Sequence, residues 1–104
     1  FPQLAELGFS DRSKFYGIED IYEARAYLDH PILGPRYLAC VETLLVHRGS
    51  RVEILMGGSV DAKKLQSSLT LMEAAGGGEQ VRQSFDLFFN GERCRSTRKI
   101  LGIA

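Results

Sequence analysis

The sequence predicts an all-α fold: a compact single-domain array of about five or six short helices. In several stretches apolar residues recur every three or four positions, which is the period of an amphipathic helix. No stretch alternates apolar and polar residues over the length of a strand, and glycines and prolines separate the helical stretches. With 104 residues, of which 44% are hydrophobic and 25% charged, residues 1–104 have the size and composition of one globular domain.

The chain opens with an apolar segment, Phe1 to Phe9, in which Ala5 to Leu7 has the length of one helical turn. Ser10 to Ser13 is typical of a helix cap and predicts a short helix carrying Phe15 and Tyr16. Natural termini are seldom apolar from the first residue. We therefore expect a fragment of a slightly longer domain that lacks its N-terminal helical part.

Two amphipathic helices are predicted next. The first runs from Ile18 to Asp29, and His30-Pro31 ends it because the residue before a proline is disfavoured in helical backbone. The second begins at Pro35, which suits a first helical position, and runs to about His47. Their apolar faces carry Ile21, Ala24, Tyr27 and Leu28 in the first helix, and Tyr37, Leu38, Val41, Leu44 and Leu45 in the second.

A short helix from Arg51 to Met56 is predicted after Ser50, which has capping-box spacing to Glu53. The central helix follows from Asp61, a favoured N-cap residue, to Ala75, where a run of glycines ends it. Its core side consists of two rows, Leu65, Leu69 and Met72, then Ser68, Leu71 and Ala75.

Two further helices complete the prediction. One runs from Glu79 to Asn90, and the other from Ser96 to Ile103. Their expected core residues are Val81, Phe85, Leu87, Phe88 and Phe89 in the first and Ile100, Leu101 and Ile103 in the second.

The composition argues against several classes of function. The 13 basic and 13 acidic residues cancel, so no overall field favours nucleic acid or an anionic membrane. No apolar run has the length of a membrane span. Cys40 and Cys94 are too few for a disulfide framework and lack metal-site spacing. We expect a soluble cytoplasmic protein, with no metal and no cofactor.

Three segments resemble a known family. They are Phe1-Pro2-Gln3-Leu4 with Gly8-Phe9-Ser10 and Tyr16-Gly17-Ile18; Ala24 to Leu28 with His30 to Arg36; and Lys64 to Leu71. Together they resemble domain of unknown function family 1810, an uncharacterised family typified by a mycobacterial conserved hypothetical protein. The resemblance implies an all-helical fold and no established activity. Some members carry a calpastatin label, but that kind of inhibitor is expected to be long, repetitive and disordered when free.

A candidate ligand site combines polar residues of the family-like segments: Gln3, Arg36, Lys64, Ser67, Ser68 and Thr70. Lys64 shares a helix face with Ser67 and Ser68, so together they could bind a phosphate or carboxylate. The alternative, which we favour by about two to one, is that the hydroxyls bond to local backbone groups. Arg36 is equally compatible with an anion contact and with a weak surface ion pair.

A basic cluster, Arg93, Arg95, Arg98 and Lys99, lies near the C-terminus. It lacks interleaved aromatic residues, so a solvated, mobile end is favoured over a nucleic-acid contact. His30 and His47 are expected to cap helix C-termini.

No catalytic signature is present, so we lean against an enzyme. Two functions of different classes remain: a helical binding module for a small anionic or nucleotide-like ligand, and a protein-protein interaction or structural domain.

Overall fold

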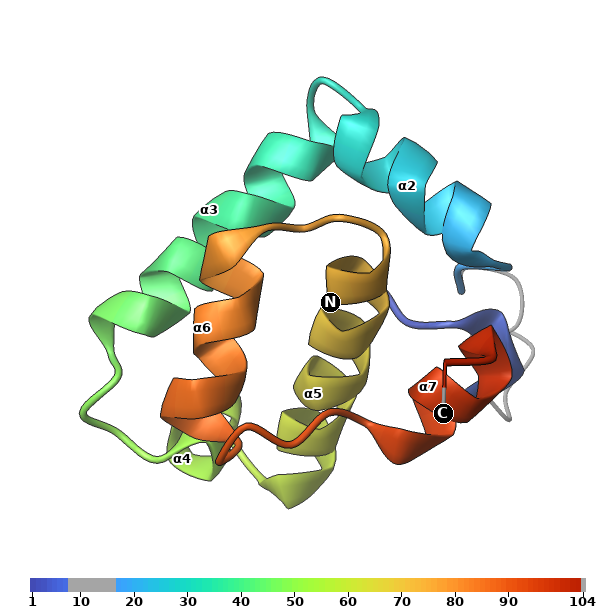
Figure 1. The fold of residues 1–104 in the computed structure, drawn as a ribbon. Coiled ribbons are helices and arrows are strands. Elements are labelled where there is room, and N and C mark those ends of the chain that lie inside the picture. The colour runs from blue at the N-terminus through green and yellow to red at the C-terminus, as the bar shows by residue number, and fades with distance from the viewer. Residues whose placement is uncertain (8–16, 104) are drawn as a thin grey trace.

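Helix α5 (Ser59–Ala74) lies at the centre of the molecule, and most other helices contact it (Figure 1). The computed structural model describes residues 1–7 and 17–103. These residues form helices and one isolated parallel bridge, between Leu4 and Ile18, with no longer strand among them. The predicted all-α, single-domain architecture is confirmed.

Six further helical elements precede or follow α5 among the described residues. They are the single 3-10 turn η1 (Ala5–Leu7), α2 (Ile21–Asp29), α3 (Leu33–Val46), α4 (Val52–Met56), α6 (Glu79–Phe88) and α7 (Arg95–Leu101). Helix α5 contacts α2, α4, α6 and α7, whereas α3 packs against α2 and α6. The fold is thus a shell of short helices around one buried helix. Among the residues described, no helix is both long and apolar enough to cross a lipid bilayer.

Burial of α5 agrees with the two rows predicted from its sequence. Leu65, Leu69 and Met72 of the first row are fully buried, and Ser68 of the second row is also inaccessible. Because Ser67 and Thr70 are buried too, the C-terminal part of α5 is enclosed on more than one face. A helix enclosed in this way must pair its polar side chains inside the protein.

Helix α2 begins at Ile21, three residues later than predicted. Ile18 is taken by the bridge instead, where its N–H donates to the Gln3 carbonyl at 2.7 Å. Asp20 then caps the helix by accepting the Glu23 N–H at 2.9 Å.

Helix α3 begins at Leu33, so the prediction that Pro35 is its first residue is wrong. Pro35 occupies the third position, where a backbone N–H has no helical partner in any case. His30 is the C-cap of α2, as predicted, and its backbone N–H donates to the Tyr27 carbonyl at 3.3 Å. Its side chain contributes to the start of α3: Nδ1 accepts the N–H groups of Ile32 and Leu33 at 3.1 and 3.2 Å.

Two predicted caps are also wrong. Helix α5 begins at Ser59 after Gly58, so Asp61 lies inside the first turn and is not the N-cap. Helix α4 follows Arg51 with no side-chain cap, so Ser50 and Glu53 do not form a capping box.

The last two helices end earlier than predicted, α6 at Phe88 and α7 at Leu101. Three residues expected in the core are partly exposed instead: Leu87, Ile100 and Ile103 are 43%, 38% and 40% exposed. Leu87 and Ile100 lie within their helices on the side turned towards solvent, and Ile103 lies beyond the end of α7. The short helix predicted to carry Phe15 and Tyr16 lies outside the described residues.

Candidate functional site

The three predicted site hydroxyls of α5 are buried and bonded within the protein. Ser68 Oγ lies 3.0 Å from the Tyr37 hydroxyl of α3. Ser67 Oγ lies 2.8 Å from Thr97 Oγ1 of α7. Thr70 Oγ1 donates to the Gln66 carbonyl at 2.7 Å and accepts the Cys94 N–H at 2.8 Å. Thr70 therefore bonds to its own helix, as the alternative interpretation expected, but all three hydroxyls also connect α5 to neighbouring elements.

The remaining predicted site residues do not join these hydroxyls. Lys64 is exposed, with its Nζ 4.0 Å from the Asp61 carboxylate. Arg36 lines a separate, small pocket of about 170 Å³ beside the rings of Tyr27 and Tyr37. Gln3 is half-buried next to the bridge. Lys64 does not line the pocket at Arg36.

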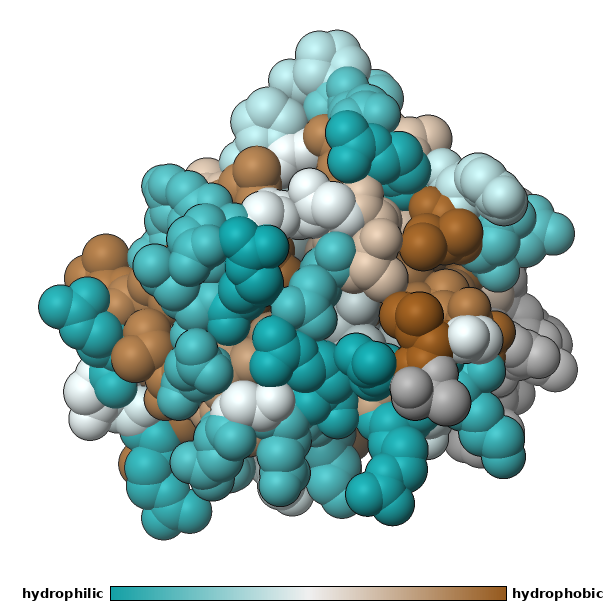
Figure 2. Space-filling model, in the orientation of Figure 1, coloured by the Kyte–Doolittle hydropathy of each residue, from teal (hydrophilic) through white to brown (hydrophobic). Residues whose placement is uncertain are grey.

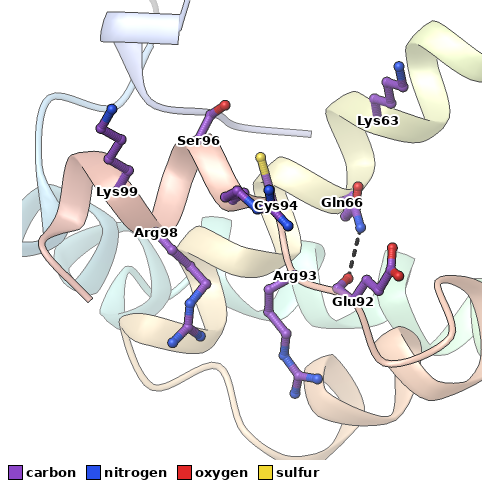
Figure 3. A pocket seen from close by; sticks show the side chains of 9 residues that line it. Lys63, Gln66, Glu92, Arg93, Cys94, Ser96, Arg98 and Lys99 are labelled. Atoms are coloured by element: carbon purple, nitrogen blue, oxygen red, sulfur yellow. Dashed lines mark hydrogen bonds between the residues drawn. The ribbon is translucent and has the colours of Figure 1, made fainter. Parts of the chain in front are cut away.

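A different site lies where α7 and the segment before it cross α5. It is an open groove of about 960 Å³, which we call the basic groove (Figure 3). Its lining residues are Lys63 and Gln66 from α5, Glu92, Arg93 and Cys94 from the α6–α7 connection, and Arg95, Ser96, Arg98 and Lys99 from α7. Five of these nine are cationic and one is acidic, in a chain whose net charge is zero.

Arg93 is the cation of the groove that is already paired. Its Nε and Nη2 donate to the two carboxylate oxygens of Glu73 at 3.0 and 2.7 Å. Its Nη1 donates to the Gly91 carbonyl at 2.8 Å, and the guanidinium carbon lies 4.2 Å from the centre of the Phe85 ring. The hydrogen bonds to Glu73 raise the pKa of Arg93 above its ordinary value. Arg93 thus anchors the α6–α7 connection to the core.

The other four cations have no such partner. Lys63, Arg95, Arg98 and Lys99, which we call the four groove cations, form no salt bridge with any residue described by the structure. Figure 2 shows the corresponding surface, where hydrophilic side chains cover the segment that joins α6 to α7.

Polar contacts hold the walls of the groove together. The Ser67–Thr97 bond joins α5 to α7 inside the protein, where both side chains are buried. The Cys94 N–H is held by Thr70 at the start of α7. Gln66 Nε2 donates to the Glu92 carbonyl at 2.8 Å, as the dashed line in Figure 3 shows. These contacts, all made within the protein, fix α7 and the segment before it against α5.

Sequence reasoning identified the basic cluster but expected it to be a mobile end, and it missed Lys63. The cluster instead belongs to α7 and its connection, which the contacts of Ser67 and Thr70 fix to α5. One signal could have indicated Lys63: it lies on one helical stripe with Gln66 and Thr70, at i, i+3 and i+7. That stripe faces α7, but nothing in the local sequence indicates that α7 packs against it.

The described residues contain no group of three His, Cys, Asp or Glu side chains placed to hold a metal ion. Cys40 and Cys94 are both free thiols, and Cys94 is half-buried at the groove.

Comparisons with known proteins agree with the fold. A family model described as "Protein of unknown function (DUF1810)" matches residues 1–101. The crystal structure of the conserved hypothetical protein Rv1873 from Mycobacterium tuberculosis superimposes with a TM-score of 0.90 at 33% sequence identity. That match covers 98% of this chain and 73% of the mycobacterial chain. No curated protein matches the chain. Neither description mentions calpastatin.

Proposed function

The chain belongs to the DUF1810 family of proteins of unknown function, and we propose that it is a helical binding module for a small anionic or nucleotide-like ligand, held in the basic groove. The observation that carries this proposal is the gathering of the four groove cations at one concave surface, without a described carboxylate partner. Like charges held close together repel, and a bound anion relieves that repulsion.

The size and lining of the groove support a ligand of this class. A volume of about 960 Å³ falls within the range of roughly 300 to 1,000 Å³ that is usual for small-molecule sites. Lysine and arginine present aliphatic stems along the walls and N–H donors at their ends. Such a surface combines apolar contact area with charged hydrogen bonds, which suits a ligand with both a carbon framework and phosphate or carboxylate groups.

This proposal changes the roles of the residues first predicted to bind the ligand. Ser67 and Thr70 become positioning residues, because their hydroxyls hold α7 and Cys94 against α5. The Ser68 hydroxyl is hydrogen-bonded to the Tyr37 hydroxyl. Lys64 and Arg36 stay available to solvent but lie outside the groove lining.

A thermal-shift screen of the chain against nucleotides, sugar phosphates and simple anions tests the proposal. A ligand present at 100 times its dissociation constant adds about 2.7 kcal/mol, which raises the unfolding midpoint by roughly ten degrees in a domain this small. Lys63→Ala should reduce the shift. Lys64→Ala is the matched control, since it removes an exposed lysine from the next position of the same helix, outside the groove.

The proposal would be rejected if no compound in the screen raised the unfolding midpoint of the folded protein. A shift abolished by Lys64→Ala and unaffected by Lys63→Ala would instead return the site to the residues predicted from sequence.

A second candidate function is a protein-protein interaction, favoured by exposed apolar side chains. Val46, Ile54 and Val60 are 76%, 72% and 67% exposed. Figure 2 shows apolar residues at the left edge, over the C-terminal end of α3. Single exposed apolar residues are ordinary on protein surfaces. An Ile54→Ser variant that stays folded and loses a partner captured by the wild-type chain would support this function, and capture unaffected by that change would count against it.

We further propose a reducing compartment such as the cytoplasm, supported by the two unbridged thiols.

A further inference from the structure

Two neighbouring side chains of the basic groove, those of Gln66 and Glu92, present hydrogen-bond acceptors instead of positive charge. The Gln66 Nε2 donates to the Glu92 backbone carbonyl at 2.8 Å, which holds the amide beside Glu92. Because this bond uses the amide nitrogen, the amide oxygen is left as an acceptor. Among the residues that the structure describes, no hydrogen bond or ion pair engages that oxygen or the Glu92 carboxylate. The pair therefore offers an amide oxygen and a carboxylate to a ligand.

These acceptors lie at one end of the basic groove. In Figure 3 Gln66 and Glu92 lie on one side of Cys94. The side chains of Arg98 and Lys99 lie on the other side of it. A ligand that occupies the groove can therefore meet positive charge with one part and hydrogen-bond acceptors with another.

Arg95 connects the two ends of the groove. It follows Glu92 by three residues, so the two Cα atoms are at most about 11 Å apart. As the first residue of α7, it has Arg98 and Lys99 as its neighbours on the helix surface, at i+3 and i+4. Arg95 and Glu92 both line the groove and both have long side chains. One small molecule can thus contact Arg95 with an anionic group and the Glu92 carboxylate with another group.

The group that meets the acceptor pair has to be a neutral hydrogen-bond donor. A second anionic group has no proton to donate, and the Glu92 carboxylate would repel it. An ammonium group could donate, but Lys63 and Arg95 line the same groove and would repel it. Sugar hydroxyls are neutral donors, and acidic side chains accept the hydroxyl of a ribose in dinucleotide-binding proteins.

We propose that the ligand of the basic groove is a sugar that carries an anionic group, as in a free sugar phosphate or the sugar phosphate of a nucleotide. The anionic group lies at Arg95, and the sugar hydroxyls donate to the Gln66 amide oxygen and the Glu92 carboxylate. This inference rests on the proposed function and narrows its ligand class. Glu92 then determines specificity, because its carboxylate binds a sugar and repels a bare anion.

Isothermal titration calorimetry of the 104-residue chain at low ionic strength tests the inference. The probes are inorganic phosphate, ribose 5-phosphate, AMP and phosphoethanolamine. Ribose 5-phosphate should bind at least about tenfold more tightly than inorganic phosphate, because a hydrogen bond to a charged group contributes about that factor. Phosphoethanolamine, which carries an ammonium group in place of the hydroxyls, should bind more weakly than ribose 5-phosphate. The tighter of ribose 5-phosphate and AMP shows whether the sugar is bound free or within a nucleotide, and either order supports the inference.

Glu92→Gln should change the affinities for two probes in opposite directions, which a merely structural residue would not do. Ribose 5-phosphate loses a charged acceptor, whereas inorganic phosphate loses a repelling charge. The preference of the chain for ribose 5-phosphate over phosphate should therefore fall by about tenfold. Arg95→Gln should weaken the binding of both probes by about tenfold. Lys64→Ala is the control that should change nothing, and circular dichroism checks that every variant is folded.

The outcomes separate this inference from the function beneath it. Equal affinity of the wild-type chain for phosphate and ribose 5-phosphate would overturn the sugar inference but leave anion binding intact. Binding of no probe would overturn both. Tighter binding of phosphoethanolamine than of ribose 5-phosphate would overturn the sugar in favour of an ammonium group. An unchanged preference for ribose 5-phosphate in folded Glu92→Gln would overturn the role of Glu92 as an acceptor.

Discussion

Tyr37 of α3 and Ser68 of α5 share a hydrogen bond inside the core, with 3.0 Å between the two hydroxyl oxygens. Ser68 is inaccessible to solvent, and Tyr37 is 3% exposed. The Tyr37 ring also meets the rings of Phe1 and Tyr27 edge to face, with centres 5.8 and 6.3 Å apart. Helices α3 and α5 are thus joined by a polar contact within an otherwise apolar region.

Tyr37→Phe should destabilise the chain by about 1 to 3 kcal/mol. The substitution keeps the ring but leaves the Ser68 hydroxyl buried without a partner, which costs its desolvation free energy. Urea unfolding followed by circular dichroism measures the change. Adding Ser68→Ala should recover part of the loss, since the unpaired hydroxyl is then removed as well. A cost below about 0.5 kcal/mol for Tyr37→Phe would show that the bond contributes little.

The same tyrosine predicts a dependence of stability on alkaline pH. Burial, which disfavours the charged phenolate, raises the pKa of Tyr37 well above its ordinary value of 10.0. In the unfolded chain the phenol therefore loses its proton first as pH rises, so the stability due to Tyr37 is complete below pH 10 and falls above it. The free energies of unfolding of wild type and Tyr37→Phe, plotted against pH, should differ by a constant amount below pH 10 and converge above it. A constant difference at all pH values would contradict the burial of Tyr37.

Gly34→Ala should destabilise the α2–α3 pair by about 2 to 3 kcal/mol or more, although alanine is normally the better helix residue. A Cβ at position 34 would overlap the carbonyl oxygen of Leu28 and lie 2.8 Å from its carbonyl carbon, and this backbone cannot move without separating the helices. Gly49→Ala is the matched control, because a Cβ there meets nothing within 4 Å. Thermal unfolding should show a lowered midpoint for Gly34→Ala but not for Gly49→Ala. Equal midpoints for the two variants would mean that α2 and α3 do not pack this closely.

Arg93→Lys should cost about 1 to 2 kcal/mol even though the charge is kept. Lysine cannot reproduce the two parallel hydrogen bonds to Glu73 or lie flat on Phe85. Both members of this ion pair are mostly buried, at 27% and 22% exposed. Arg82→Lys is the control, since its pair with Glu79 is solvated and its loss should leave stability unchanged. If both substitutions gave the same urea midpoint, Arg93 would not anchor the α6–α7 connection.

Helix positions could be predicted because the information is local. The spacing of Leu65, Leu69 and Met72 identifies the core face of α5 without knowledge of its neighbours. Helix starts were less predictable because they depend on distant backbone. Ile18 forms a bridge with Leu4 and is therefore not part of α2. No local sequence pattern indicates that Leu4 and Ile18 are neighbours.

The candidate site was harder to predict than the fold for the same reason. Ser67 and Ser68 were recognised as unusual polar residues on a core helix. Their partners Thr97 and Tyr37 lie 30 and 31 residues away in the chain, so the sequence alone could not distinguish an internal hydrogen bond from a ligand contact. The groove depends on the crossing of α5 and α7, which places Lys63 beside the basic cluster of α7, and no local sequence pattern predicts that crossing.

Leu69→Ala should cost about 2 to 5 kcal/mol, because the side chain is completely buried in the central helix and its removal leaves a cavity. Val60→Ala, near the start of the same helix, is the control: that side chain is 67% exposed, so its truncation should change the free energy of unfolding by less than about 0.5 kcal/mol. Urea unfolding of both variants measures the difference. Since α5 contacts four other helices, the cavity should lower the stability of the whole chain in one transition and not detach a single helix. A small, local effect of Leu69→Ala would mean that α5 is not the element on which the remaining helices are assembled.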